Sequence, residues 1–114
     1  MSHAKMEPEA SEYLLVLMTT GTIEEAKTIA RALVDSRLAA CVNILPRITS
    51  VFRWQDEVEE QDELLLLAKT MKGTFQDLCE TVRTLHSYDV PEIIAISLER
   101  GDAAYLKWVS ESVF

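Results

Sequence analysis

The segment from Ile48 to Thr70 limits the possible folds more than any other part of the chain. Residues 48–54 and 58–70 read as two strands, because both are rich in apolar and β-branched residues and the polar turn Gln55-Asp56-Glu57 separates them. These strands are near or above the usual upper length of about 10 residues. A two-stranded ribbon is marginal in water, and exposed strand edges favour pairing with another chain. We therefore expect part of this hairpin to project beyond its own subunit and to be covered in an oligomer.

Two elements and a broken strand precede this segment. The apolar run Tyr13 to Thr20 predicts a buried strand. Thr22-Ile23-Glu24-Glu25 has capping-box spacing and predicts a helix to about Arg37. Leu38 to Ile44 returns to strand character, and Pro46 implies an edge, a bulge or a bend because proline has no amide to donate. The predicted inward face of the helix is Ile23, Ala26, Ala30, Leu33 and Val34.

Two helices and a strand follow it. Thr74 and Asp77 form a cap-like pair at the start of a second helix, and Pro91 prevents helix at Val90. Ile93 to Leu98 reads as the last strand, after which Gly101-Asp102 begins a third helix. The predicted inward residues are Phe75, Leu78, Val82 and Leu85 in the second helix, and Tyr105, Leu106, Val109 and Val113 in the third.

The order of elements is βαββαβ followed by a C-terminal helix, which predicts an α+β fold of the ferredoxin-like class. Such a fold has a four-stranded antiparallel sheet with two helices on one face. A length of 114 residues fits one domain. We expect residues 12–114 to form it and residues 1–11, with Pro8 among glutamates and no apolar export segment, to form a flexible tail. Composition and periodicity do not distinguish a dimer from a trimer.

The charge and cysteine content exclude several classes of partner. A net charge of −8 disfavours nucleic acid and anionic membranes. The longest uninterrupted apolar run, Tyr13 to Met18, is far shorter than the roughly 20 residues that span a bilayer. Cys41 and Cys79 are too few and too far apart for a disulfide framework or a zinc-binding pair. These observations predict a cytoplasmic protein.

No motif of a known catalytic class is present. Glycine occurs only at positions 21, 73 and 101, which leaves no glycine-rich phosphate loop. A Ser or Cys nucleophile needs a His base, and His86 is the single candidate because His3 lies in the tail. We therefore predict that the chain is not an enzyme and that it carries no organic cofactor.

Three groups of residues are candidates for binding. The acidic stretch Glu57 to Glu63 fits either a hard-cation site or a solvated hairpin that resists aggregation, and we favour the latter. His86 and Glu92 offer nitrogen and oxygen ligands for copper or zinc, although a helix-ending His that is solvated or bonded to a carbonyl is an equal alternative. Trp54 and Lys69 lie on opposite arms of the hairpin, where they fit a ligand cleft or, as we favour, a subunit interface.

Five segments form a recognisable pattern: Leu38 to Ile44, Ser50 to Trp54, Glu63 to Thr70, His86 to Ile93 and Asp102 to Trp108. Together they resemble the CutA family of divalent-cation-tolerance proteins, and the resemblance runs from about Tyr13 to the C-terminus. The resemblance implies a tight homotrimer of ferredoxin-like subunits whose hairpins pair between neighbours, similar to the PII signalling proteins. It also implies a link to tolerance of copper and other divalent ions, with no established catalysed reaction.

The same resemblance implies a copper site at Met18, His86 and Glu92. A cysteine can occupy the position of Met18 in the family, and a thioether favours Cu(I) over Cu(II) or Zn(II). Two further departures lie in loops: Asp56-Glu57 stands where a Gly-Lys pair is common, and Ser87 stands where a proline often follows the His.

The resulting functional hypothesis is a homotrimer that binds a metal ion or small ligand in inter-subunit clefts, in a signalling or buffering role. The predicted pocket residues are Trp54, Lys69, Tyr88 and Glu92. The alternative is a structural trimer that binds a protein partner and affects metal tolerance only indirectly.

Overall fold

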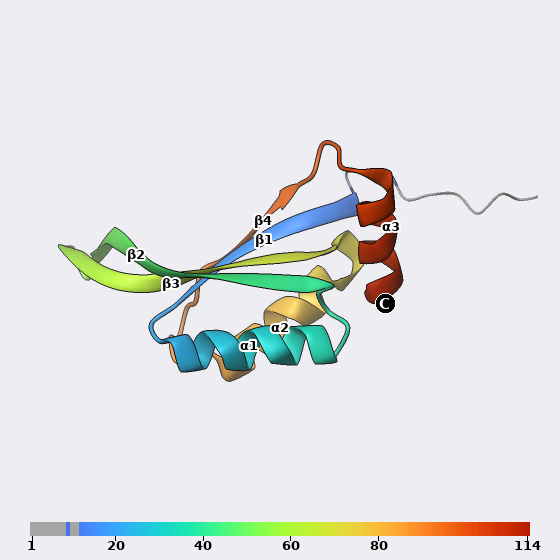
Figure 1. Cartoon of the computed structure of the whole chain (residues 1–114). Coiled ribbons are helices and arrows are strands. Elements are labelled where there is room, and N and C mark those ends of the chain that lie inside the picture. Colours follow the sequence, from blue (N-terminus) through green and yellow to red (C-terminus); the bar gives the residue numbers. More distant parts are fainter. Residues whose placement is uncertain (1–8, 10–11) are drawn as a thin grey trace, which may run out of the picture.

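The structure is a computed structural model that describes Glu9 and residues 12–114. Most of the predicted tail, residues 1–8 and 10–11, lies outside the described residues, so the tail stays a prediction. The elements follow one another in the predicted order (Figure 1). They are β1 (Tyr13–Thr20), α1 (Ile23–Asp35), β2 (Cys41–Trp54), β3 (Glu57–Met71), the 3-10 helix η2 (Lys72–Thr74), α2 (Phe75–Leu85), β4 (Ile93–Ser97) and α3 (Ala103–Ser112).

The four strands form one antiparallel sheet in the order β2-β3-β1-β4. α1 and α2 lie side by side on one face of this sheet (Figure 1). This is the split βαβ arrangement, so the predicted α+β class and the four-stranded antiparallel sheet are confirmed. The main core fills the layer between sheet and helices, and its largest fully buried side chains include Met18, Ile29, Leu33, Leu66 and Leu78.

The helix starts are fixed by side-chain caps at two of the three predicted positions. Thr22 and Asp102 each accept a hydrogen bond from the backbone N–H three residues further on, at 3.1 Å in both cases. Thr74 does not cap α2, which corrects the sequence expectation. Its hydroxyl instead donates to the Met71 carbonyl at 3.0 Å and shares a hydrogen bond with the Thr70 hydroxyl at 2.7 Å, so it is already engaged.

The buried stripe of α1 differs from the predicted one. Ala26, Ile29 and Leu33 are buried, whereas Ile23 and Val34 are 37% and 42% exposed. Ile29 was not part of the predicted face. The spacing of three and four residues through Ala26, Ile29 and Leu33 centres the stripe on the sheet and leaves Ile23 and Val34 at its margins.

β2 continues through the proline that interrupts its sequence pattern. The pairing with β3 shifts register between Leu45 and Ile48, and Arg47 takes a positive φ of 68° there. This irregularity is a β-bulge, one of the outcomes expected from Pro46.

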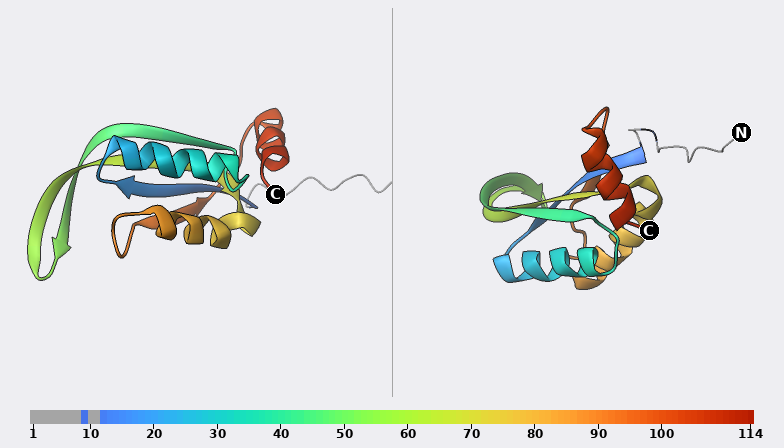
Figure 2. Two further views of the ribbon diagram at one scale, coloured as in Figure 1. Left: turned by 90° about the horizontal axis from the view of Figure 1, so that it is seen from below. Right: turned by 45° about the vertical axis from the view of Figure 1, so that its right-hand side comes forward.

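The β2–β3 hairpin extends beyond the rest of the sheet. β1 ends opposite Leu64, so residues 48–54 and 57–63 pair only with each other. The described chain measures 62 × 26 × 22 Å, and the hairpin forms one end of the long axis (Figure 1). The hairpin also bends toward the loop that follows α2 (Figure 2). The predicted projection of the hairpin from its own subunit is confirmed.

The sheet face opposite α1 and α2 is mostly apolar and mostly uncovered, and we call it the open face. Side chains alternate along a strand, so Leu15 and Leu17 point away from the core that holds Val16 and Met18. α3 covers one end of the open face, where Val109 and Val113 pack with Tyr13. The rest of the open face consists of apolar residues and one polar group. The apolar residues are Leu15 and Leu17 on β1, Leu45 on β2, Leu65 and Leu67 on β3, and Ile94 and Ile96 on β4. The polar group is Lys69 with Cys41 and Asn43.

Leu85 and Tyr105 correct two further expectations, because both were predicted to point inward but are 38% exposed on α2 and 42% exposed on α3. The ring of Tyr105 lies against Trp108 on the same helix, with centroids 5.5 Å apart. Within the described residues, no helix is both long and apolar enough to cross a bilayer.

Candidate functional site

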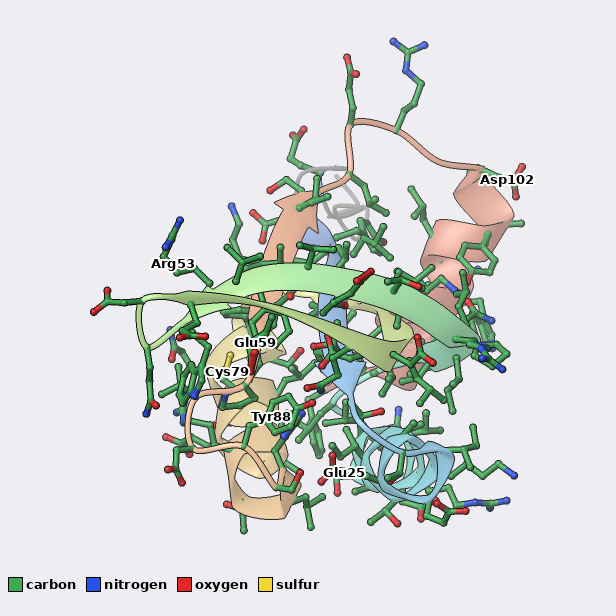
Figure 3. The ribbon with its side chains drawn as sticks, turned by 90° about the vertical axis from the view of Figure 1, so that its left-hand side faces the viewer. Glu25, Arg53, Glu59, Cys79, Tyr88 and Asp102 are labelled. Carbon is green, nitrogen blue, oxygen red and sulfur yellow. The ribbon has the colours of Figure 1, made fainter. Side chains whose placement is uncertain are left out.

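A pocket of about 490 Å³ lies between the bent hairpin and the loop that joins α2 to β4. Carboxylates and aromatic rings dominate its walls. The carboxylates are Glu59, Glu63, Asp89 and Glu92, and the aromatic residues are Phe52, Trp54 and Tyr88. Figure 3 shows Glu59 on the hairpin and Tyr88 on the loop, facing the same region of the molecule.

The strand geometry explains why these side chains share one surface. Glu59, Gln61 and Glu63 are alternate residues of β3, so their side chains lie on the same face. Phe52 of β2 pairs directly with Glu59 and brings an aromatic ring to that face. The bend of the hairpin then turns this face toward Tyr88.

Tyr88 connects the loop to the hairpin through its hydroxyl group. The hydroxyl donates to Glu63 Oε2 at 2.9 Å and accepts from Gln61 Nε2 at 2.7 Å. Burial raises the pKa of the Tyr88 phenol, and the hydrogen bond to and negative charge of Glu63 raise it further. Glu63 itself is only 7% exposed. The phenol therefore stays protonated and holds a buried carboxylate in place.

His86 fixes the start of the same loop. Its side chain is fully buried. Nε2 lies 2.7 Å from the Thr19 carbonyl oxygen, which can only accept, so Nε2 carries the proton. Nδ1 accepts the Tyr88 N–H at 3.0 Å. In the single chain His86 thus bonds a carbonyl, and both ring nitrogens are engaged.

Glu25 on α1 holds the loop from the other side. Its carboxylate accepts the Ser87 N–H at 2.8 Å and the Ser87 hydroxyl at 3.2 Å. It also lies 3.9 Å from Nδ1 of His86. The loop is therefore anchored to β1, to α1 and, through Tyr88, to β3.

The structure places the three predicted metal ligands at one end of the sheet but in different surroundings. Met18 is 1% exposed within the core and pairs with Ile93, whereas Glu92 lines the pocket. His86 uses both nitrogens in hydrogen bonds. As placed in a single chain, these side chains do not fit a shared metal ion. Within residues 12–114 no group of three or more His, Cys, Asp or Glu is placed to hold one either. The copper site stays a prediction.

The predicted ligand residues are brought together in part. Trp54, Tyr88 and Glu92 all line the pocket, and Lys69 does not. Trp54 pairs with Glu57, whereas Lys69 pairs with Cys41 near the other end of β3, so the two are not cross-strand neighbours within one chain. Lys69 Nζ instead donates to Asn43 Oδ1 and lies 3.7 Å from Cys41 Sγ.

Sequence reasoning missed the pocket roles of Phe52, Glu59, Gln61 and Glu63. The acidic stretch was treated as a whole, as a solvated surface or a hard-cation site. Alternation along β3 was the available signal, because it separates Glu59 and Glu63 from Glu60 and Asp62 on the opposite face.

Comparison with known proteins gives consistent results over nearly the whole domain. The sequence profile of the family described as "CutA1 divalent ion tolerance protein" matches residues 14–112. The divalent-cation tolerance protein CutA of Thermus thermophilus is 53% identical over 98 residues, which cover 86% of this chain and 95% of the relative. The CutA homolog of Xenopus laevis is 48% identical over 88 residues, which cover 77% of this chain and 58% of the relative.

A solved structure supports the same assignment. The chain superimposes on the divalent cation tolerance protein of Thermus thermophilus with a TM-score of 0.88 and 51% identity. This match covers 90% of this chain and 99% of that protein. Because the family profile matches residues 14–112 and the fold is shared, the chain belongs to the CutA1 divalent ion tolerance protein family.

Proposed function

We propose that this protein acts in tolerance to divalent cations as a homotrimer, with a metal ion or small ligand bound in clefts between subunits. Its role is buffering or signalling of the kind carried out by the PII proteins, and it acts in the cytoplasm. The observation that supports the assembly most strongly is the open face, an apolar sheet surface that lies uncovered in the single chain.

The open face has the properties of a subunit interface. Ile94 and Ile96 are 53% and 54% exposed, and they pair with Leu17 and Leu15 of β1. Monomeric proteins seldom expose large contiguous apolar patches, which usually mark interaction surfaces. β2 and β4 are also edge strands with unpaired backbone groups. A second copy supplies both an apolar partner and a strand edge. That the assembly contains three subunits is inferred from the resemblance to the CutA family.

The pocket supports a cleft between subunits. Trp54 is 57% exposed, although it belongs to a wall of the pocket. It lies on the part of the hairpin that no other strand of the same chain supports. A neighbouring subunit that packs against the hairpin therefore closes the open side of the pocket.

Direct copper binding sets a further requirement on the loop. Nδ1 of His86 must release the Tyr88 N–H before its lone pair is available to a metal ion. Met18 must also turn out of the core in which it is 1% exposed. A bound small ligand requires neither change.

A substitution that introduces a charged side chain on the open face tests the proposal. Ile96→Glu removes no core contact, because the side chain is already half exposed, but it places a carboxylate in the proposed interface. Val34→Glu on α1 is the matched control, with 42% exposure on the opposite side of the molecule. Light scattering gives the mass of each variant. Growth on copper of a sensitive strain without its own family member gives the tolerance.

We expect Ile96→Glu to lose the trimer and the tolerance together, and Val34→Glu to retain both. An Ile96→Glu protein with the mass of the wild type would contradict the interface. A monomeric variant that still confers tolerance would contradict the inter-subunit cleft.

A further inference from the structure

We propose that the pocket between the hairpin and the 86–92 loop binds a small organic cation, an alkylammonium, with Glu63 as its counter-charge and Trp54 and Phe52 as its apolar wall. This inference rests on the proposed function, because it specifies the class of ligand that occupies the same cleft. Charge, aromatic composition and size each support it.

The charge of the pocket is one-sided. Its lining residues include four carboxylates and no Lys, Arg or His. Glu63 is only 7% exposed, and its hydrogen-bond partner is the neutral Tyr88 hydroxyl. Among the described residues no cationic group lies within 4.0 Å of Glu63. A buried carboxylate without a counter-charge is costly, and a cation bound in the pocket removes that cost.

The aromatic residues favour an organic cation. Cations are attracted to the faces of aromatic rings, most strongly to tryptophan, and alkylammonium groups are recognised in this way. Phe52, Trp54 and Tyr88 supply such rings. Tyr88 is held in advance, because its N–H, its hydroxyl and its ring contact with His86 (centroids 4.7 Å apart) are all fixed.

Size and ligand geometry argue against a bare metal ion at this place. Hard cations need several oxygen atoms at about 2.0–2.6 Å, converging on one point. Within residues 12–114 no three carboxylates, cysteines or histidines are so arranged. The volume of 490 Å³ lies instead in the range of about 300–1,000 Å³ that is typical of small-molecule sites.

The inference is tested by titration calorimetry on the full-length, assembled protein. The probes are 1,4-diaminobutane, tetramethylammonium and the uncharged butane-1,4-diol, which matches the diamine in length. The variants are Glu63→Gln, which removes the buried charge, and the control Glu60→Gln, which removes an equal charge from the exposed opposite face of β3. A third variant, Trp54→Leu, keeps an apolar side chain without the ring.

We expect the wild type to bind at least one of the two cations and not the diol. Glu63→Gln should weaken that binding by about tenfold or more, because a charge-assisted contact is lost. Glu60→Gln should bind as the wild type does, and Trp54→Leu should bind less tightly. Equal binding of the diol and the cations, or unchanged binding in Glu63→Gln, would overturn the inference.

The outcomes separate this inference from the function on which it rests. A protein that forms trimers and confers copper tolerance but binds neither cation contradicts the organic-cation site alone. A protein that binds the cation through Glu63 but confers no tolerance contradicts the proposed function and supports the site. Light scattering on each variant identifies any loss of binding that follows from loss of assembly.

Discussion

Tyr88 is the residue on which the pocket depends most, because it joins the loop to the hairpin. Burial and the neighbouring Glu63 raise the pKa of its phenol. The unfolded chain has an ordinary tyrosine pKa of about 10. Below that pH the phenol is neutral in both states and the stabilisation is fully present. Above it the unfolded chain releases the proton first, so the free energy of unfolding falls as pH rises and the contribution is lost through the folded pKa.

We therefore predict that the stability of the wild type decreases above about pH 10, and that Tyr88→Phe makes this decrease shallower. Urea denaturation of both proteins at a series of pH values measures the free energy of unfolding and its slope with pH. Cys79 and Tyr105 also have raised pKa values, chiefly from burial, so part of the slope remains in the variant. A slope identical in the two proteins would show that Tyr88 titrates normally.

At Met18 and His86 the central question is whether copper binds directly. If it does, Cu(I) should bind more tightly than Zn(II), and Met18→Leu should reduce this preference because the soft thioether is lost. Leucine has a similar volume, so the core should tolerate it. Anaerobic competition titrations measure both affinities.

His86 needs a variant that preserves the fold. His86→Ala leaves the Thr19 carbonyl without its donor, whereas the amide of His86→Gln can still supply one. Unchanged Cu(I) affinity in both variants would rule out His86 as a ligand and make Cys41 or Cys79 the next thiol to test.

At the scale of elements, the hairpin turn carries measurable strain. Gln55 and Asp56 form a two-residue turn with φ values of 50° and 67°. Type I′ turns of this kind favour Asn-Gly. The double substitution Gln55→Asn with Asp56→Gly should raise the free energy of unfolding by about 0.5–1 kcal/mol. Thermal melts at one fixed protein concentration measure it, with Asp56→Ala as a control that should lower the midpoint. A lower midpoint for the Asn-Gly protein would mean that the turn is held by other contacts.

The sequence predicted the elements well where local spacing decides the structure. Thr22 was recognised as a cap from its capping-box spacing and Asp102 from its residue type at a helix start. Pro46 was expected to mark an edge, a bulge or a bend because it lacks an amide, and the structure has the bulge. Thr74 was misjudged because its hydroxyl has a closer partner in Thr70, and spacing along the chain does not reveal such competition.

At the scale of the whole molecule, the pocket could be predicted only in part. Trp54, Tyr88 and Glu92 were expected to line a ligand site, and they meet because the hairpin bends toward the loop after α2. The bend arises from strand twist and from the bulge at Arg47, and no periodicity in the sequence encodes its direction. Lys69 was grouped with Trp54 because the register of such long strands was not known.

We propose that this CutA-family chain functions as a trimer in which neighbouring subunits cover the open face. Multi-angle light scattering after size exclusion, repeated over a range of micromolar concentrations, measures the mass of the assembly. We expect a mass of three times 12.9 kDa that does not change on dilution. A mass of one or two chains over that range would contradict the trimer and the clefts between its subunits.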